Sequence, residues 1–588
     1  MLASGTVFLH DNSPSGGPSR LFAGPSEILT TRLPSEAPGL IRRAEEALSR
    51  GAHVAGFLSY ELGLVFEEKL AALLPAEAAF PLLWLGVFDR PQELSRDEAR
   101  DWLNGQAGMA TAEISALAFS MTRADYGAAF RRAMDYIAAG DVYQVNLTLR
   151  AGFELSGDPA ALYRDLCRSQ PVAHGALIAT DTFDVLSLSP ELFVESRAGR
   201  IVTRPMKGTS GRGRTAEEDA DFVHALRASE KARAENLMIV DLLRNDIARV
   251  AETGSVSVPR LFEVETYRSF HAMTSTIEAQ LQPEVSFGGV IAALFPCGSV
   301  TGAPKIRAME IIDQLEGGPR GLYCGSIGYA APGGDFAFNV AIRTAVIGRD
   351  GVGEIGTGGG IVADSGEEAE YQEALLKLRF LRAEPPLGLI ETLLWDGQRF
   401  ALLDRHMRRL ERSARYFAIP FNEGEAIAAL SKAVASRADA LRVRLVLGED
   451  GIDVTTAPLT ALTRLRFRIA PDRVSSAEPL LYHKTTRRAF YDRARVDSGA
   501  DEVVFVNERG ELTEGSFTNL FLRLGGALVT PALACGLLPG TLREELIATG
   551  AAAERILTAD DLATADAIYL GNSVRGLVAA EWIGRDGT

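Results

Sequence analysis

The chain has 588 residues, of which 47% are hydrophobic and 23% are charged, as is ordinary for a soluble globular protein. A single hydrophobic core does not extend over this length, so several domain-sized units are expected. The formal net charge of −16 argues against nucleic acid as a partner, because phosphate binding needs a basic surface, although a few buried arginines can still hold a small anion.

The sequence shows no feature of a secreted or membrane protein. Residues 1–17 lack the basic start and the apolar run of a signal peptide, and no apolar run approaches the length of a membrane span. The four cysteines have no CxxC spacing, so they predict neither a disulfide framework nor a zinc site and are typical of a reducing compartment. We expect a cytoplasmic protein that binds neither membranes nor nucleic acid.

The first part of the chain carries few reactive side chains. Residues 1–117 mix short strands and helices. After Thr122, apolar residues recur at helical spacing up to Gly140, which predicts a helix that ends at the glycine. The next stretch, GDVYQVNLT, reads as a strand with Gln144 among its polar residues. Polar residues that alternate along a strand usually face solvent, so this stretch alone is a weak sign of a site.

A carboxylate and a lysine then flank a predicted hairpin. Glu191 lies in SPELF, and Lys207 follows sixteen residues later in RPMKGT. The intervening FVESRAGRIVTRP predicts a strand, a turn and a returning strand, which would bring Glu191 and Lys207 close together. Most lysines are solvated surface residues, so the role of Lys207 depends on what surrounds it.

Two later helices carry carboxylates on faces that are expected to point inward. SEKARAENLMIVDLLRND places Glu235 among apolar neighbours, and EEAEYQEALLKLRF places Glu370 and Glu373 three residues apart on one face. An inward carboxylate is costly unless it is paired, protonated or bound to a metal. Glu373 and Lys377 also fit an ordinary surface pair. Two such helices nevertheless predict a Mg²⁺ site, because this ion prefers oxygen ligands.

Anion-binding features lie between and beside these helices. FPCGSVTGAPKIRAMEIID resembles a loop that accepts an anion at the start of a helix, and GTGGGIVADS is a glycine-rich turn whose amides can approach an anion. FNVAIRTAVI predicts a strand that carries Arg343. A buried arginine needs a carboxylate partner, from the protein or from a ligand.

As an ordered set, these motifs resemble the chorismate-utilising enzymes, which include anthranilate, isochorismate and aminodeoxychorismate synthases. The motifs are GDVYQVNL, SPELF, PMKGT, RAENLMIVDLLRND, GSVTGAPKIRAMEIID, GSIGY, AIRT and GGGIVADSGEEAEYQE. The resemblance implies an α+β fold that depends on Mg²⁺ and takes chorismate as substrate. The motifs lie within residues 140–373. We expect residues 1–384 to form this unit and to divide into an N-terminal subdomain, 1–117, and a chorismate-binding core, 118–384.

The resemblance also assigns roles to residues. It implies that Glu235 and Glu373 are metal ligands, assisted by Glu370. It makes His271 a catalytic candidate near the substrate ring, although a buried wall residue is an equal alternative. The substrate-binding residues that it implies are Gly208, Thr209, Tyr323, Arg343, Gly358, Gly359 and Gly360.

Lys207 selects among the members of this family. Anthranilate synthases resemble this segment but have a small residue at the position of Lys207, whereas aminodeoxychorismate synthases have the lysine. A buried lysine with a lowered pKa is a nucleophile that can add to carbon 2 of the ring while the hydroxyl at carbon 4 leaves. Glu191 is the expected acid and base, and ammonia would then replace the lysine. No segment resembles a glutaminase, so a separate glutamine amidotransferase subunit is the expected source of ammonia.

A second domain is expected over residues 387–588. In LRAEPPLGLIETLLWDG a helical segment ends near Arg382, Pro385 and Pro386 prevent its continuation, and a strand begins at Leu389. LLDRHMRRLERSARYF then predicts a basic amphipathic helix, which by itself reads as a solvated face. LLYHKTTRRAF places Lys484 at the end of a strand.

Two signals in the remaining sequence are more specific. DEVVFVNERGELTEGSFTNLFL predicts a hairpin with its turn at residues 507–510 and leads to Glu514. In GLLPGTLREELI a loop precedes Thr541, which with Glu544 matches a capping box at the start of a helix. A helix N-terminus reached through Pro-Gly-Thr predicts a phosphate site.

In this order the motifs resemble the fold-type IV pyridoxal-phosphate enzymes, which include class IV aminotransferases and aminodeoxychorismate lyase. The resemblance implies that Lys484 binds pyridoxal 5′-phosphate covalently and that Glu514 pairs with its pyridine nitrogen. Thr392 is the implied substrate-guiding residue. Its assignment is less specific than the others, because the domain starts abruptly near Leu387. The implied phosphate-binding residues are Arg409, Gly540, Thr541 and Ser573. Relatives of this kind also suggest a homodimer through this domain.

The two resemblances together imply consecutive reactions. Chorismate and ammonia would give 4-amino-4-deoxychorismate, and elimination of pyruvate would then give 4-aminobenzoate, a precursor of folate. The motifs of the second domain alone allow either transamination or elimination. One alternative is an anthranilate- or isochorismate-type synthase joined to a class IV aminotransferase. Another makes one half a degenerate scaffold or a regulatory binding module, which the intact Lys207, Glu191, Lys484 and Glu514 oppose.

Overall fold

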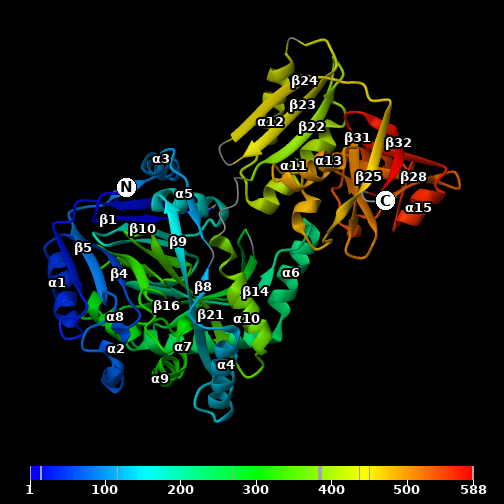
Figure 1. Ribbon diagram of the computed structural model, residues 1–588. Helices are drawn as coiled ribbons and strands as arrows, with labels where there is room; N and C mark the ends of the chain where they lie inside the picture. The colour runs from blue at the N-terminus through cyan, green and yellow to red at the C-terminus, as the bar shows by residue number, and fades with distance from the viewer. Residues whose placement is uncertain are drawn as a thin grey trace. The chain divides into compact units, whose positions relative to one another are not determined.

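The computed structural model describes residues 2–13, 16–115, 117–268, 270–381, 387–435, 437–448 and 451–585 (Figure 1). The chain forms two compact units, of which the first comprises Met1–Gly211 with Val223–Glu384, and the second Arg212–Phe222 with Pro385–Thr588. The expected interruption at Pro385 and Pro386 lies outside the described residues. Within the described residues, no helix is long and apolar enough to cross a membrane.

The first unit contains two large antiparallel sheets. Among the described residues, sheet A has eleven strands, and β7 (Ala112–Ile114) and β8 (Ala118–Phe119) add to its long strand β9. Its other strands, in spatial order, are β17 (Gly302–Ala303), β9 (Gln144–Gly157), β21 (Val352–Ile361), β20 (Thr344–Gly348), β11 (Phe183–Ser189), β10 (His174–Ala179), β1 (Thr6–His10), β2 (Ser19–Phe22) and β6 (Gln92–Leu94).

Sheet B has ten strands in the described part of the chain, with β15 (Ser257–Thr266) paired to β16. The predicted hairpin between Glu191 and Lys207 is confirmed as the antiparallel pair β12–β13, in which Leu192 lies opposite Arg204. The other strands, in spatial order, are β14 (Met206–Gly211), β16 (Phe270–Gln280), β13 (Arg200–Arg204), β12 (Leu192–Arg197), β19 (Phe336–Asn339), β18 (Ser326–Ala330), β4 (His53–Leu58), β5 (Leu83–Phe88) and β3 (Glu27–Thr31).

The two sheets pack face to face through large apolar side chains. Val7 and Ile178 of sheet A share a core cluster with Phe57 and Ile327 of sheet B. Burial of a side chain of this size contributes roughly 1.5–3 kcal/mol. Strands from residues 1–117 lie in both sheets, so the expected division of this unit at residue 117 does not separate its two layers.

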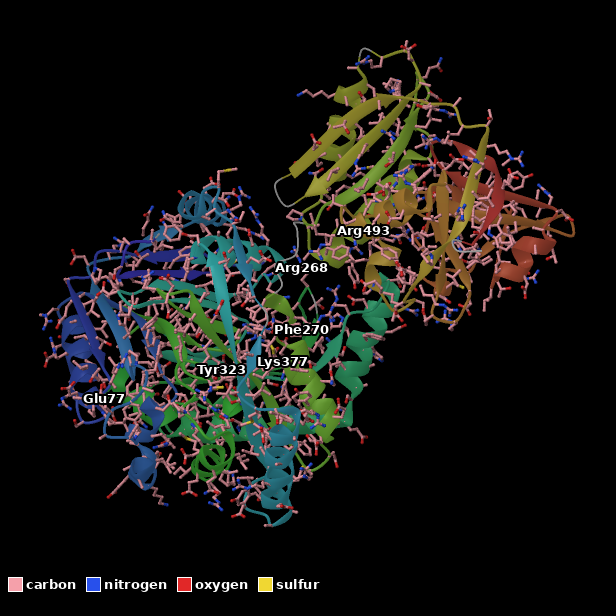
Figure 2. The ribbon with its side chains drawn as sticks, viewed as in Figure 1. Glu77, Arg268, Phe270, Tyr323, Lys377 and Arg493 are labelled. Carbon is pink, nitrogen blue, oxygen red and sulfur yellow. The ribbon has the colours of Figure 1, made fainter. Side chains whose placement is uncertain are left out.

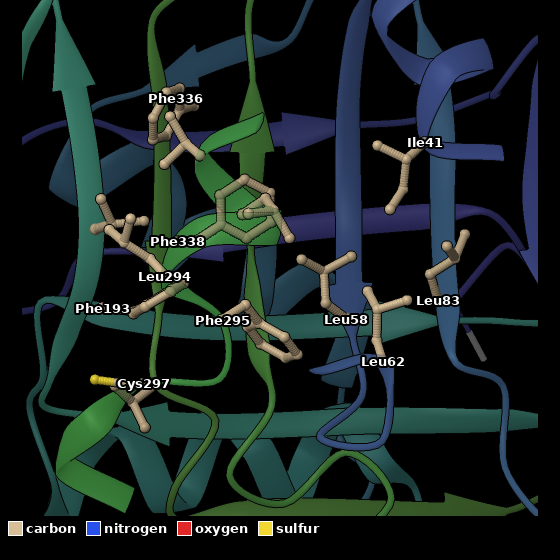
Figure 3. Packing of buried hydrophobic residues seen from close by; sticks show 14 of the residues in the cluster. Ile41, Leu58, Leu62, Leu83, Phe193, Leu294, Phe295, Cys297, Phe336 and Phe338 are labelled. Carbon is tan, nitrogen blue, oxygen red and sulfur yellow. The ribbon is translucent and has the colours of Figure 1, made fainter. Parts of the chain in front are cut away.

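Helices cover the other face of sheet B and carry part of the site. Figure 3 shows the cluster in which Ile41 of α1 and Leu294 of α8 pack against Leu58 and Phe338 of the sheet. The predicted helix after Thr122 is confirmed as α4, where Thr122 caps the first turn. The helices of this unit are α1 (Ala37–Ser49), α2 (Leu62–Val65), α3 (Arg96–Ala107), α4 (Arg123–Ala138), α5 (Pro159–Ser169), α7 (Glu230–Ala248), α8 (Phe287–Leu294), α9 (Lys305–Glu316) and α10 (Glu367–Leu376), and α6 (Ala216–Ala228) crosses the division between the units.

The second unit has one small and one larger sheet. The three-stranded sheet contains β22 (Leu389–Trp395), β23 (Leu441–Gly448) and β24 (Gly451–Pro458), and helices α11 (Leu403–Phe417) and α12 (Glu423–Val434) pack on it. The predicted strand at Leu389 and the predicted amphipathic helix are therefore confirmed as β22 and α11.

The larger sheet is mixed. The predicted hairpin is confirmed by β26 and β27, which pair on either side of the turn at 507–510. In spatial order the strands are β27 (Leu512–Gly515), β26 (Glu502–Asn507), β25 (Arg464–Val474), β32 (Gly576–Arg585), β31 (Ala567–Asn572), β28 (Asn519–Leu524), β29 (Ala527–Pro531) and β30 (Ala553–Arg555), with helices α13 (Ala489–Ser498), α14 (Thr541–Ala548) and α15 (Ala559–Thr564).

Two candidate active sites

The first unit encloses a cavity of about 380 Å³. The predicted residues that line it come from two strands, two helices and the loops between them. They are Glu191, Lys207, Gly208, Thr209, Glu235, Tyr323, Arg343, Gly358, Gly359, Gly360, Glu370 and Glu373. Phe270 and Lys377, which line the same cavity, are labelled with Tyr323 in Figure 2.

Lys207 enters this cavity at an irregular point of β14. The pairing of β14 with β16 shifts register between Met206 and Thr209, and Gly208 there has φ +84°, a conformation that favours glycine. A Cβ at Gly208 would also lie only 2.9 Å from the Cβ of Ala232 in α7. The local sequence KGT therefore allows the strand to pass close to α7 while the lysine points to the cavity.

The electrostatic surroundings favour neutral forms of Lys207 and Glu191. Burial lowers the pKa of Lys207, against the opposing effect of Glu191, and the positive charge of Lys377 lowers it further. Burial raises the pKa of Glu191, although Ser299 and Lys207 oppose the rise. Both shifts are in the direction that a nucleophilic amine and a general acid require, and both groups line one cavity.

The predicted metal ligands lie on α7 and α10 and face the same cavity. Glu235 is 3.8 Å from Lys231, Glu373 is 2.8 Å from Lys377, and Ser365 Oγ donates to Glu370 Oε1 at 2.7 Å. The surface-pair interpretation of Glu373 and Lys377 is thus correct as a contact, although both residues also line the cavity.

The donor chemistry of these carboxylates fits Mg²⁺. Burial raises the pKa of Glu235, and the negative charge of Glu373 adds to the rise, so the two carboxylates of different helices affect each other. Among the residues that the structure describes, no group of three or more acidic, histidine or cysteine side chains is arranged to hold a metal ion. An ion between the helices would therefore complete its shell with water or with substrate oxygens.

Arg343 occupies a different backbone position from the predicted one. It precedes β20 with φ +51° and does not lie within a strand, because the chain bends there before Thr344. Its Nη1 donates to Gln170 Oε1 at 3.0 Å and its guanidinium lies 4.6 Å from the centre of the Phe270 ring. Within the described residues, no carboxylate forms an ion pair with Arg343, and burial lowers the pKa of Arg343 to about 10. The arrangement leaves this cation available to an anionic ligand.

His271 does not line the cavity. It lies on β16 opposite Ser210, is fully buried, and its Nδ1 is 3.0 Å from Thr266 Oγ1. This placement corresponds to the alternative interpretation of His271 as a wall residue.

Sequence reasoning did not identify Gln144, Ser299 and Lys377 as site residues, yet all three line the cavity. Gln144 is buried on β9, and its Nε2 has no hydrogen-bond partner within the described structure. The available signal was the polar alternation of GDVYQVNLT. That pattern could not show that both faces of β9 are covered by protein.

The second unit encloses a cavity of about 340 Å³. It is lined by Arg409, Lys484, Glu514, Gly540, Thr541 and Ser573. Thr392 lies behind this lining and accepts a hydrogen bond of 3.2 Å from Lys484 Nζ. Burial lowers the pKa of Lys484 to about 7, and the nearby Arg409 contributes to the shift. A substantial fraction of this amine is therefore neutral and nucleophilic near neutral pH.

Glu514 lies at another wall of this cavity. Tyr491 Oη donates to its Oε1 at 3.1 Å and Asn519 Nδ2 to its Oε2 at 3.5 Å. Burial raises the pKa of Glu514 to about 7, although Arg488 opposes the rise. A protonated ring nitrogen would supply the charge partner that this buried carboxyl needs.

The predicted phosphate end is built around the start of α14. Gly540 is the residue that precedes the helix, and a Cβ there would lie 1.8 Å from Asn519 Oδ1, so only glycine fits. The predicted capping box is wrong: Thr541 is the first helical residue, its hydroxyl is 3.2 Å from His406 Nε2, and Glu544 pairs with Arg412 at 2.8 Å. The free amides at this helix start suit a phosphate.

Two residues of this site, Glu391 and His406, were missed from the sequence. Glu391 Oε1 and Oε2 accept hydrogen bonds of 2.9 and 2.6 Å from Arg409, and Glu391 Oε2 is 2.5 Å from His406 Nδ1. The sequence shows only that Glu391 lies among the apolar residues of β22 and His406 within the amphipathic helix α11, a pattern that does not distinguish a core position from a solvated one. The glycine cradle, the buried lysine and the arginine fit pyridoxal 5′-phosphate.

Comparison with known proteins gives a family match for each half of the chain. Residues 22–383 match the family of chorismate binding enzymes, and residues 388–582 match amino-transferase class IV. The chain is 43% identical over 339 residues to aminodeoxychorismate synthase component 1 of Klebsiella aerogenes, a match that covers 55% of this chain and 75% of that protein.

Anthranilate synthases are also similar. Component 1 from Aquifex aeolicus is 42% identical over 262 residues, 45% of this chain and 53% of that protein. The crystal structure of anthranilate synthase component I from Streptococcus pneumoniae aligns with a TM-score of 0.53 and 26% identity, over 63% of this chain and 93% of that one. The protein belongs to the chorismate binding enzymes and carries a class IV aminotransferase domain in its C-terminal part.

Proposed function

We propose that this enzyme converts chorismate and ammonia to 4-amino-4-deoxychorismate in its first unit, and that its second unit eliminates pyruvate from this product to give 4-aminobenzoate for folate synthesis. The observation that carries the proposal is the position of Lys207, which faces the cavity together with Glu191. The similarity to an aminodeoxychorismate synthase component supports the choice of substrate.

In the proposed first reaction, Lys207 acts as a neutral amine and Glu191 as a protonated carboxyl. The amine of Lys207 adds to ring carbon 2, the ring double bonds shift, and the hydroxyl at carbon 4 leaves as water with the proton of Glu191. Ammonia then adds at carbon 4, and the lysine leaves carbon 2 with its electron pair. Glu191, now a carboxylate, accepts the proton that ammonia loses. Arg343 would hold a carboxylate of the substrate.

Glu235 and Glu373 would hold Mg²⁺ in this half, assisted by Glu370. The ion, when bound, would neutralise carboxylate charge on the substrate. The ammonia would come from a glutamine amidotransferase partner, as the resemblance to component 1 proteins suggests.

In the second unit, Lys484 would bind pyridoxal 5′-phosphate and Glu514 would face the pyridine nitrogen. The bound cofactor supplies an electron sink for the carbon that carries the substrate amine. The amine of Lys484, once free of the cofactor, would take the proton from this ring carbon. The enolpyruvyl group would leave from the neighbouring carbon as enolpyruvate, which takes up a proton to become pyruvate, and the ring would become aromatic. Thr392, which contacts Lys484, would guide the substrate.

The proposed enzyme and the alternative, an anthranilate- or isochorismate-type synthase joined to a class IV aminotransferase, make different products. The full chain is incubated with chorismate, ammonium, Mg²⁺ and pyridoxal 5′-phosphate. The aromatic acids are then separated and identified by mass spectrometry. We expect 4-aminobenzoate and pyruvate in equal amounts, and accumulation of 4-amino-4-deoxychorismate when the second cofactor is left out. Anthranilate as the product would contradict the first half of the proposal. Transfer of the amine to a 2-oxo acid without pyruvate release would contradict the second.

Lys207→Ala provides the sharper test of the first half. We expect it to lose amination of chorismate while still converting added 4-amino-4-deoxychorismate to 4-aminobenzoate. The matched control is Lys69→Ala, which removes a lysine outside both cavities. Full amination by the Lys207→Ala variant would exclude the nucleophilic role.

A further inference from the structure

A buried polar network lies beneath the phosphate end of the second cavity. His406 of α11 is fully buried, with its Nδ1 2.5 Å from Glu391 Oε2. Its Nε2 is 2.9 Å from Ser573 Oγ and 3.2 Å from Thr541 Oγ1. Ser573 and Thr541 are two of the residues that line the cavity, so His406 connects a carboxylate in the core to two hydroxyls at the surface of the site.

Charged groups on the elements around His406 shift its pKa in opposite directions. Glu391 on β22 raises the pKa of His406, whereas Arg409 on α11 and Lys484 lower it. Burial has the largest effect, and the net shift of the His406 pKa is downward. For Glu391, burial raises the pKa, but Arg409 and His406 outweigh it and bring it to about 2. At neutral pH the network therefore holds an ionised Glu391 and a neutral His406.

These protonation states fix the hydrogen-bond directions. An ionised Glu391 only accepts, so the single proton of a neutral His406 lies on Nδ1 and is donated to Glu391. Nε2 then has a lone pair, and a hydroxyl of Ser573 or Thr541 donates to it. A hydroxyl has one proton, and the proton that faces His406 is no longer available to the cavity.

A phosphate in the cavity requires the opposite orientation of these hydroxyls. Phosphate oxygens only accept, so the hydroxyls of Ser573 and Thr541 must turn their protons toward the phosphate. Their oxygen lone pairs then face the lone pair of Nε2, which is repulsive. A proton on Nε2 removes the conflict, because an imidazolium donates to Glu391 through Nδ1 and to the hydroxyls through Nε2.

We propose that His406 is a positioning residue that takes up a proton when the phosphate group of pyridoxal 5′-phosphate binds, and that this proton turns the hydroxyls of Ser573 and Thr541 into phosphate donors. The inference rests on the proposed function of the second unit. His406 then has a higher pKa in the phosphate-bound protein than in the free protein. The part of the affinity that depends on the phosphate is therefore greatest at low pH, and it falls as the pH rises through the pKa of His406 in the bound state.

Proton uptake is measured with pyridoxamine 5′-phosphate, which has no aldehyde and so forms no covalent bond with Lys484. Calorimetry of the full chain at pH 7.5 in two buffers of different ionisation enthalpy gives the number of protons taken up. Pyridoxamine without the phosphate is the control, since it meets the same Lys484 and Glu514. We expect an uptake of about one proton that depends on the phosphate. Free phosphate esters are dianions above pH of about 6, so they release few protons of their own here.

His406→Gln tests which group takes the proton. The amide nitrogen of glutamine can donate to the hydroxyls without titrating, so this variant should retain binding, weakened about tenfold, and lose the phosphate-dependent uptake. Unchanged uptake in the variant, or no uptake in the native protein, would overturn the proposal. Should the variant not fold, carbon-13 labelling of the histidines in the native protein gives the same answer. If no histidine becomes charged when pyridoxamine 5′-phosphate is added, the proposal is equally overturned.

The outcomes separate this inference from the proposed function. A chain that does not bind pyridoxamine 5′-phosphate contradicts the assignment of the second unit itself. A chain that binds it without proton uptake leaves that assignment intact and contradicts only the role of His406.

Discussion

Gly360 faces Lys207 in the first cavity: a Cβ placed on Gly360 would lie 3.3 Å from Lys207 Nζ. The same Cβ would lie 3.0 Å from the amide of Gln144. The glycine-rich strand β21 therefore leaves the space into which the amine extends.

Gly360→Ala should displace Lys207 and lower the rate of chorismate amination by about 10- to 100-fold, because small displacements of a reacting group have effects of this size. Conversion of added 4-amino-4-deoxychorismate should be unchanged. Gly105→Ala is the control, since no heavy atom lies within 4 Å of its added Cβ. Equal amination rates for both variants would show that Lys207 tolerates displacement.

Glu235→Gln should raise the Mg²⁺ concentration needed for half-maximal amination by more than about tenfold, because it replaces the negatively charged carboxylate ligand on α7 with a neutral amide. Titration of amination activity with Mg²⁺ measures this. The matched control is Glu368→Gln, which removes an exposed carboxylate of α10 that pairs with Arg123. Chelation should stop amination and spare the second reaction. A Mg²⁺ requirement that Glu235→Gln leaves unchanged would place the ion elsewhere.

Lys484 should react with pyridoxal 5′-phosphate at an unusually low pH. Its pKa is lowered from 10.5 to about 7 by burial, so the reactive neutral amine increases as the pH rises through about 7 and is nearly complete by about 8. The rate of covalent attachment, followed by the absorbance of the cofactor and trapped by borohydride, should level off there. A rate that keeps rising to pH 10 would mean that the amine is solvated. Lys484→Ala should give no adduct.

Glu391→Gln should destabilise the second unit by about 3 kcal/mol at pH 7. The pKa of Glu391 is lowered from 4.5 to about 2 in the folded protein, so its stabilising effect is complete above about 4.5 and is lost as the pH falls toward 2. Urea unfolding at pH 7 and at lower pH, compared with native protein, measures the difference.

Glu411→Gln removes the exposed partner of Arg415 and is the control for this change, with an expected effect below about 0.5 kcal/mol. A Glu391→Gln difference that does not shrink with acid would show that packing, rather than charge, stabilises the network.

Residues with specific local patterns were predictable from the sequence. Lys207 and Glu191 flank a hairpin whose strands and turn follow from residue type, and Gly540 precedes a helix in a pattern that favours a phosphate. Glu391 and His406 were not predictable, because a histidine within an amphipathic helix has the same pattern on a solvated face as in a core. Arg343 shows a second limit: the apolar run around it predicts a strand, but its positive φ depends on the two sheets that hold the loop.

The distribution of the N-terminal strands over sheets A and B also constrains synthesis of the protein. β4 pairs with β5 on one side and with β18 on the other, although β18 lies far downstream in the chain. β1 similarly pairs with β10. During translation these early strands leave the ribosome with open hydrogen-bonding edges, and neither layer is complete before residues beyond 330 have emerged. A nascent chain of this enzyme therefore needs shielding from aggregation until most of its first unit has been made.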